Sequence, residues 1–451
     1  MNTRTREDQD MSCSSCSSDK TPSAVESVRN LLAFLVTSAP DYSSIRDDDW
    51  SILGDAMVST ETLVSFLQNT KRCVFQSRGD ARCRDDGKID VLNLAGFSLE
   101  SVSEEVGERL RECVDVGEVQ RLYLSGNALR SNCVEDIFRI CSKHVLELFL
   151  DSNVLKTVPW DTLVSCDVVL THLDLSKNRI SRLGCDAVSD GMVCSRLEWV
   201  DLSGNSRLEE LPETGFFSTL PNLKRLDLHS CMLARLPKDI CCVKDTLEHL
   251  SLHSNCFVEL PDEITECTQL TWMSLNSNAL ERLPQSMGNL VNLQRLSLHI
   301  NKLNEIPESL SHCIHIEALS LHSNDLRSIP DSIGCLKECV RLSLHHNPSL
   351  GCIPDGICEM SQLKELWMYD CGIEHINPKI GRLKNLQKLW LDRNPFDVNG
   401  DVPWESLKQL EMLQELYLDA HLDTGETSKF HDNKDITELK EALKHLKTLS
   451  V

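Results

Sequence analysis

Leu247-Glu-His-Leu-Ser-Leu-His-Ser-Asn255 is the first of several closely similar nine-residue segments between residues 247 and 354. Each has the form Leu-x-x-Leu-x-Leu-x-x-Asn, with an occasional apolar substitute, and the final asparagine recurs every 23 residues, at positions 255, 278, 301, 324 and 347. An apolar residue followed by proline comes soon after each asparagine, as in Leu260-Pro261. A constant period indicates repeated structural units. No unit can bury its leucines alone, so the units must stack.

The chemistry of each slot predicts the shape of the unit. Alternation in Leu-x-Leu places both leucines on the core side of a short strand and turns the residue between them outward. Asparagine follows where the chain leaves the strand, and its amide can pair with backbone groups that the turn leaves free. This pattern is typical of a leucine-rich repeat. We expect an α/β solenoid, a right-handed horseshoe with a parallel concave sheet, a helical N-terminal region and a C-terminal helical cap.

Less regular copies extend the repeat on both sides. The first, beginning at Ile89, has Phe97 in the asparagine slot. Between Asn127 and Asn255 the spacing is 24 to 27 residues, so we expect the extra residues to form helical turns on the convex side, for example at 184–193. Behind the 23-residue units we expect shorter extended or 3₁₀ segments. The sequence predicts about thirteen or fourteen repeats in all.

Four segments follow from this interpretation. Residues 1–22 are charged and Ser-rich, which is typical of a disordered tail. Residues 23–88 contain apolar residues at helical spacing and predict a helical N-terminal region or cap. The solenoid is predicted over 89–422. Residues 423–451 predict a capping helix, whose apolar stripe is Ile436, Leu439, Leu443 and Leu446.

Charge and cysteine content bear on partners and compartment. Acidic residues outnumber basic ones by 69 to 46, for a net charge of -23. This balance argues against nucleic acid and anionic membranes and favours basic partners, unless it serves solubility alone. The 21 cysteines are scattered, and none follows Cys371, where secreted repeat proteins commonly carry closing disulfides. The chain shows no signal peptide and no apolar run long enough to cross a bilayer. We therefore expect a cytoplasmic protein without membrane insertion.

The endings of the regular units resemble those of a known family. Segments such as Leu260–Ile264, Leu283–Met287 and Ile329–Ile333 have the form apolar-Pro-x-x-apolar. They are similar to the intracellular Ras-group and Scribble-type leucine-rich repeat proteins, whereas units in 119–196 are closer in length to ribonuclease-inhibitor-type repeats. The resemblance implies a non-catalytic protein–protein interaction scaffold of intracellular signalling. It also implies a small GTPase or a phosphatase subunit as partner.

Outward-facing strand slots supply the candidate binding residues. Tryptophan, tyrosine and arginine dominate binding hot spots, and exposing several on one rigid face gives no folding advantage. We expect a protein partner on the concave surface, at Trp199, Arg225, His229, His249, His253, Trp272, Arg295, His299, His322, Arg341, His345, Trp367, Tyr369, Trp390 and Tyr417. The alternative is that these rings only pack on neighbours in adjacent strands. Three consecutive histidines would repel one another when charged, so we expect binding or local order to change below about pH 6.5.

A second function class is a regulatory subunit or an enzyme component. Asp174, Asp201 and Asp227 occupy one column of the concave face, as either a solvated charge ladder or a metal site. No Ser-His-Asp or paired Cys/His spacing accompanies them. The favoured interpretation is a protein that is not an enzyme, with no catalytic, cofactor-binding or metal-binding residues.

Overall fold

The structure is a computed structural model that describes residues 91–96, 99, 107–108, 110–111, 114, 119–141, 143–165, 169–184, 193–396, 402–418 and 434–450. The predictions for the tail (1–22), for the N-terminal helical region (23–88) and for nearly all of 184–193 lie outside these residues.

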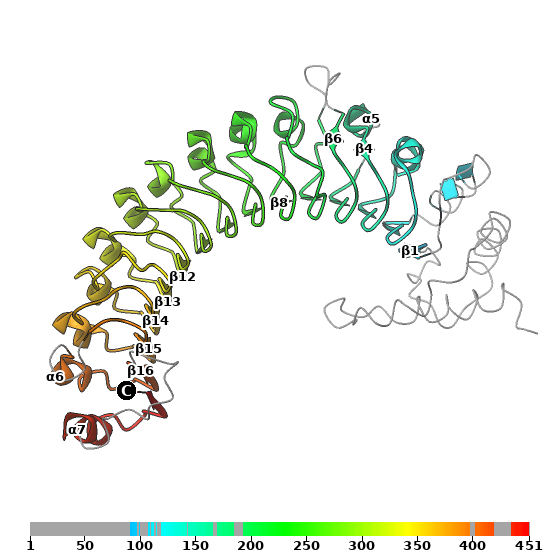
Figure 1. The fold of residues 1–451 in the computed structure, drawn as a ribbon. Helices are drawn as coiled ribbons and strands as arrows, with labels where there is room; N and C mark the ends of the chain where they lie inside the picture. Colours follow the sequence, from blue (N-terminus) through cyan, green and yellow to red (C-terminus); the bar gives the residue numbers. More distant parts are fainter. Residues whose placement is uncertain are drawn as a thin grey trace, which may run out of the picture.

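The described chain is a curved solenoid built on one long parallel sheet (Figure 1). Fifteen described strands follow one another in chain order, and each pairs in parallel with the next. They are β1 (Val91–Asn93), β2 (Arg121–Tyr123), β3 (Glu147–Phe149), β5 (His172–Asp174), β7 (Trp199–Asp201), β8 (Arg225–Asp227), β9 (His249–Ser251), β10 (Trp272–Ser274), β11 (Arg295–Ser297), β12 (Ala318–Ser320), β13 (Arg341–Ser343), β14 (Glu365–Trp367), β15 (Lys388–Trp390), β16 (Glu415–Tyr417) and β17 (Thr448–Ser450). A separate pair joins β4 (Thr157–Val158) to β6 (Arg182–Leu183).

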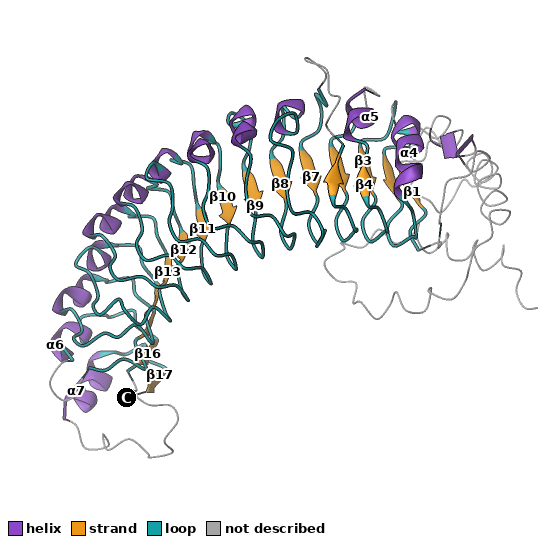
Figure 2. Cartoon of the chain, turned by 45° about the horizontal axis from the view of Figure 1, so that its top comes forward, coloured by secondary structure: helices purple, strands orange, loops and turns teal. Residues whose placement is uncertain are grey.

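The strands of the long sheet line the inner side of the arc and the helical segments line its outer side (Figure 2). Longer N-terminal units carry η3 (Ser131–Cys133), α4 (Val134–Ile140) and α5 (Trp160–Ser165). The later units carry 3₁₀ segments, and the last two carry short α-helices: η4 (Phe217–Thr219), η5 (Lys238–Val243), η6 (Asp262–Glu266), η7 (Met287–Asn289), η8 (Glu308–His312), η9 (Asp331–Cys335), η10 (Ile357–Glu359), η11 (Pro378–Arg382), α6 (Trp404–Leu407) and α7 (Lys434–Ala442). The prediction of 3₁₀ segments behind the 23-residue units is confirmed. No described helix is long and apolar enough to cross a membrane.

The core is continuous from the first described strand to the last helix. In β11, Arg295 is exposed, Leu296 is buried and Ser297 is half-buried, as alternation requires. Leu298, one residue beyond the strand, is also fully buried. The middle residues of neighbouring strands stand in register, so Leu296 lies between the equivalent Met273 and Leu319. The prediction that both leucines of Leu-x-Leu enter one shared core is confirmed.

The asparagine slot joins each unit to the one before it. Asn301 accepts a hydrogen bond through Oδ1 from the Leu280 amide, 3.0 Å away. Its Nδ2 donates to the Leu275 carbonyl at 3.0 Å and to the Leu298 carbonyl of its own turn at 2.9 Å. Asn324 repeats this arrangement one unit later. Backbone N–H and C=O groups at the turn, where the chain leaves the sheet, are thereby hydrogen-bonded. The same bonds hold stacked units in a fixed register.

The C-terminal end differs from the sequence-based boundary at residue 422. Ile436, Leu439 and Leu443 of the predicted helix are buried, and the helix is α7. The sheet continues beyond it, however, because β17 pairs in parallel with β16. The repeat pattern did not predict this fifteenth strand, because no asparagine slot follows Leu449. Leu446-x-x-Leu449, which has the Leu-x-x-Leu spacing that opens each repeat, was the feature that could have predicted it.

Candidate protein-binding face

The sheet places the predicted binding residues together on the concave face. The nine positions of Leu-x-x-Leu-x-Leu-x-x-Asn are numbered here as slots one to nine. Third-slot residues begin their strands, and seventh-slot residues lie two positions beyond the strand ends. Four of the fifteen are exposed, namely Arg225, His249, Arg295 and Arg341, and the others are half-buried. Tertiary structure therefore brings together residues from β7 to β16.

Seventh-slot imidazoles stack on one another across neighbouring strands. The His299 and His322 ring centroids are 4.3 Å apart, and those of His322 and His345 are 4.1 Å apart. Tyr369 continues the stack at 4.3 Å from His345, with only 8° between the ring planes. A separate N-terminal pair, His229 and His253, stacks at 4.4 Å. Ring packing on ladder neighbours, the alternative raised from the sequence, is thus present.

Tryptophans and tyrosines extend this stack toward the C-terminus. Trp390 lies 5.7 Å from Trp367 and 5.3 Å from Tyr417 between ring centroids. Tyr369 is 6.4 Å from Trp390 and so links the two groups. Together these rings form the ring ladder, which consists of His299, His322, His345, Trp367, Tyr369, Trp390 and Tyr417.

Histidines of the ring ladder are held neutral. Burial, together with the neighbouring imidazoles, lowers the pKa of His322 to about 4 and that of His345 to about 3. Burial also lowers the pKa of His299. The expectation that binding or local order changes below about pH 6.5 stays a prediction, and in the folded chain His322 and His345 take up protons only near pH 4 and below. Partial burial in the stack, which the sequence does not show, is the reason.

The N-terminal half of the face has its own polar cluster. Asp227 is buried, and its Oδ2 accepts from Arg225 Nε at 2.8 Å and from Trp199 Nε1 at 3.3 Å. The Arg225 guanidinium also lies over the Trp199 ring, 5.1 Å from its centroid. Two of the predicted binding residues are thus already engaged by Asp227. Because the cluster satisfies its own charges, it is less available to a partner than the ring ladder.

The aspartate column is not assembled as a metal site. Burial raises the pKa of Asp174 to about 6 and also raises that of Asp201. Asp227, the third member, is occupied by Arg225. Among the described residues, no group of three or more His, Cys, Asp or Glu side chains is placed to hold a metal ion.

Three polar atoms near the centre of the face have no hydrogen-bond partner among the described residues: Ser343 Oγ, His345 Nδ1 and Trp367 Nε1. Ser343 and Trp367 are paired in register on β13 and β14. In contrast, Ser274 Oγ donates to Asn276 Oδ1 at 2.7 Å. Ser343 was not among the predicted site residues. Reading the fifth slot as a column, where serines precede Trp367, would have found it.

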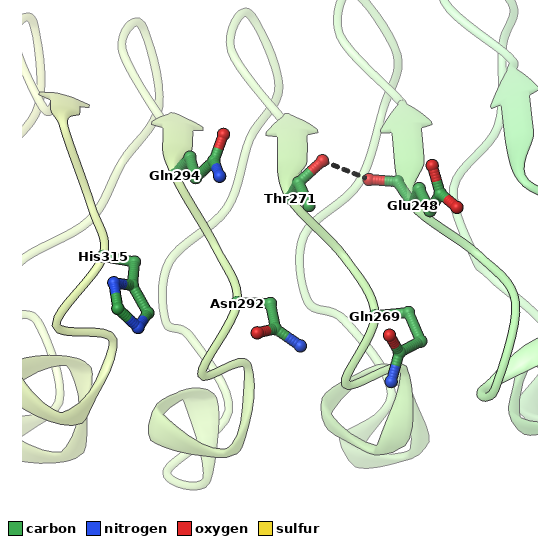
Figure 3. A pocket seen from close by; sticks show the side chains of 6 residues that line it. All are labelled: Glu248, Gln269, Thr271, Asn292, Gln294 and His315. Carbon is green, nitrogen blue, oxygen red and sulfur yellow. Dashed lines mark hydrogen bonds between the residues drawn. The ribbon is translucent and has the colours of Figure 1, made fainter.

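A shallow polar groove of about 440 Å³ lies elsewhere, where several strands begin (Figure 3). Its lining residues are Glu248, Gln269, Thr271, Asn292, Gln294 and His315. Thr271 Oγ1 donates to the Glu248 carbonyl at 3.2 Å. The groove is open to solvent and includes none of the predicted binding residues. It lacks the apolar lining that is usual for small-molecule sites.

Comparison with known proteins agrees with this architecture. Among solved structures, the chain is similar to a leucine-rich repeat protein of Leptospira interrogans, with a TM-score of 0.54 and 23% identity, covering 84% of this chain and 98% of that one. The chain has the leucine-rich repeat fold. An internalin from Listeria monocytogenes shares this fold with a TM-score of 0.57 and 18% identity, covering 76% of this chain and 88% of that chain.

Similarity at the level of sequence is narrower. No family model matches the chain. Leucine-rich repeat serine/threonine-protein kinase 1 of Mus musculus is 33% identical over 125 residues, which are 27% of this chain and 6% of that protein. The chain thus spans a small part of the length of this relative. The feature that this chain has in common with all three proteins is the leucine-rich repeat.

Proposed function

We propose that this leucine-rich repeat solenoid is a non-catalytic interaction scaffold whose protein partner binds the concave face over β11 to β16. The ring ladder is the observation that carries the proposal. Its tryptophan and tyrosine rings are half-buried, so part of each still faces solvent on the concave side. Large aromatic side chains on a preorganised surface supply contact area at a low cost in conformational entropy.

The neutral histidines support the same conclusion. An interface excludes water, and an uncharged imidazole is transferred into it at much lower cost than an imidazolium ion. Because the pKa values of His322 and His345 lie near 4 and 3, both rings are neutral at neutral pH. The centre of the ring ladder therefore combines aromatic area with polar atoms that can be desolvated.

We also propose that the scaffold acts in cytoplasmic signalling, with a small GTPase or a phosphatase subunit as partner. The apolar-Pro-x-x-apolar endings of the regular units, which resemble those of intracellular leucine-rich repeat proteins, support this assignment. None of the described cysteines forms a disulfide, which agrees with a reducing compartment.

Single substitutions of Trp272, Trp367 and Trp390 by alanine test the binding face. A partner would be isolated with the wild-type chain and its Kd measured for each purified variant, with thermal stability measured in parallel. We expect the ring-ladder substitutions at Trp367 and Trp390 to weaken binding by roughly tenfold or more. Val258→Ala, which truncates an exposed apolar side chain outside the sheet, is the control.

The proposal fails if the tryptophan variants bind as the wild type does. It also fails if binding is lost only in variants that unfold. Where alanine unfolds the chain, phenylalanine at the same position retains an aromatic ring and keeps the comparison possible.

A further inference from the structure

Two arginines of the concave face lack the carboxylate partners that their counterparts have. Among the described strands, five third-slot residues are basic: Arg121, Arg225, Arg295, Arg341 and Lys388. Arg121 is paired with Glu147 at 3.0 Å, Arg225 with Asp227 at 2.8 Å and Lys388 with Glu365 at 3.3 Å. Within the described part of the chain, Arg295 and Arg341 form no ion pair, although acidic residues outnumber basic ones by 69 to 46.

The unpaired arginines flank a small residue. Ala318 stands in register between Arg295 on one side and Arg341 on the other. Two strand spacings of about 4.8 Å place the two arginine backbones roughly 10 Å apart. A methyl side chain between them leaves space above the sheet that a long side chain would fill. Arg295, Ala318 and Arg341 are together called the arginine notch.

The surroundings of the arginine notch are mostly uncharged. Below it on the same strands, the hydroxyls of Ser297 and Ser320 lie 2.9 Å and 3.3 Å from the neutral His299 imidazole. Glu365, the register neighbour of Arg341 on β14, is bound to Lys388. The two guanidinium groups are thus left as donors toward solvent on the concave side.

We propose that the arginine notch binds an acidic side chain of the protein partner, whose carboxylate inserts above Ala318 between the two guanidinium groups. Guanidinium groups bind carboxylates through paired, charge-assisted hydrogen bonds, and approach from two sides would satisfy both carboxylate oxygens. The notch lies beside the ring ladder, since Arg295 and His299 belong to one unit, as do Arg341 and His345. This inference rests on the proposed function and adds the charge of the partner segment.

Overall charge favours a basic partner, and the arginine notch refines that expectation. The net charge of -23 acts at long range and is screened by salt beyond about 10 Å. A buried contact between the notch and one carboxylate acts at short range and selects the residue that docks there. The partner segment is therefore expected to carry an aspartate or a glutamate at the position that contacts β12.

Selection of peptides from a random displayed library on the full chain tests the proposal. Parallel selections would use the wild type, the double variant Arg295→Gln/Arg341→Gln and the control Arg235→Gln/Arg327→Gln. Arg235 and Arg327 are exposed, form no ion pair among the described residues, and lie outside the sheet, in the segments that lead from the strand turns to Pro237 and Pro330. Selected peptides would then be synthesised with each acidic residue replaced by its amide.

We expect wild type and control to select peptides with a fixed acidic position, and the notch variant to lose that preference. Replacing the selected carboxylate by an amide should weaken binding to the wild type by roughly tenfold or more, with little effect on binding to the notch variant.

Three outcomes would overturn the inference: selection of peptides without an acidic preference, an unchanged preference in the notch variant, or failure to select any peptide. Peptides without acidic preference that still require Trp367 or Trp390 would leave the proposed function intact, whereas peptides indifferent to both tryptophans would count against it.

Discussion

At the scale of single residues, the eighth slot of the repeat imposes an unusual backbone. Residues in this slot have φ between 51° and 57° in ten described units, and glycine occupies it in others, as at Gly204. The chain turns off the strand here, immediately before the asparagine slot. Serine fills five of these ten positions, while Ile300 is a β-branched residue held at φ 54°. The left-handed region costs an L-residue roughly 1 to 2 kcal/mol, and branching at Cβ adds to that cost.

Ile300→Asn should therefore raise local stability by about 1 kcal/mol, because asparagine tolerates the left-handed region better than isoleucine. The measurement is the free energy of local unfolding from native-state hydrogen exchange. Val258→Asn is the matched control, since Val258 is 47% exposed and Ile300 is 51% exposed, but Val258 has no positive φ. Equal effects at the two positions would show that apolar exposure, not backbone strain, is responsible.

Ser343 is a residue whose side chain is expected to lower the stability of the fold. Its buried hydroxyl has no partner among the described residues, and an unpaired buried polar group is destabilising. Ser343→Ala should raise the free energy of unfolding by about 1 kcal/mol, whereas Ser274→Ala should lower it by about 1 kcal/mol because Ser274 donates to Asn276. Chemical denaturation of both variants measures the sign of the change in the free energy of unfolding. A loss of stability in Ser343→Ala would indicate a partner, such as an ordered water, for this hydroxyl.

At the scale of elements, each unit depends on its neighbours. Parallel strands of only three residues and 3₁₀ segments of three to six residues have little stability of their own. Hydrogen bonds of the asparagine slot and leucines shared between units hold them together. Coupling in such arrays runs mainly between nearest neighbours.

Leu298→Ala should consequently cost roughly 2 to 5 kcal/mol, since Leu298 is fully buried and alanine leaves a cavity. Hydrogen exchange should accelerate first in β10 to β12, the strand of the altered unit and its two neighbours. Comparison with amides in β3 and β15 separates this local response from global unfolding. An equal loss of protection in those distant strands would contradict the nearest-neighbour description.

At the scale of the whole molecule, the concave face changes character along the arc. Its N-terminal part carries Asp174, Asp201 and the Trp199–Arg225–Asp227 cluster, and its C-terminal part carries the ring ladder. The arginine notch lies within the ring-ladder half. A partner that spanned several units would therefore contact chemically distinct regions in a defined order along the sheet.

The histidines of this face make stability depend on pH in a definite direction. Folding lowers the pKa of His322 from 6.5 to about 4, so the unfolded chain binds the proton more readily. The contribution of this neutral ring to stability is present above pH 6.5 and is lost as the pH falls toward 4. His322→Phe keeps an aromatic ring that cannot be protonated, and should show a smaller loss of stability between pH 7 and pH 5 in urea denaturation. His445→Phe, outside the ring ladder, is the control, and an undiminished loss in His322→Phe would contradict the assignment.

The local sequence pattern was enough to predict the repeat and the direction of its side chains. The Leu-x-Leu alternation predicted which residues of each strand enter the core, and the asparagine period predicted a ladder that the structure contains at Asn301 and Asn324. These features follow from local geometry, because a strand has a period of two and every unit repeats the same turn. The same reasoning placed the third and seventh slots on the concave face.

How residues in different units interact depends on the stacking of the units. The tertiary structure showed that His322 and His345 are stacked and neutral, that Arg225 is engaged by Asp227 while Arg295 and Arg341 are unpaired, and that β17 completes the sheet. Ion pairing and proton affinity depend on distances and burial across strands about 23 residues apart, which a linear pattern does not encode. The fold was therefore readable from the sequence, whereas the chemistry of its concave face required the stacked arrangement of the units.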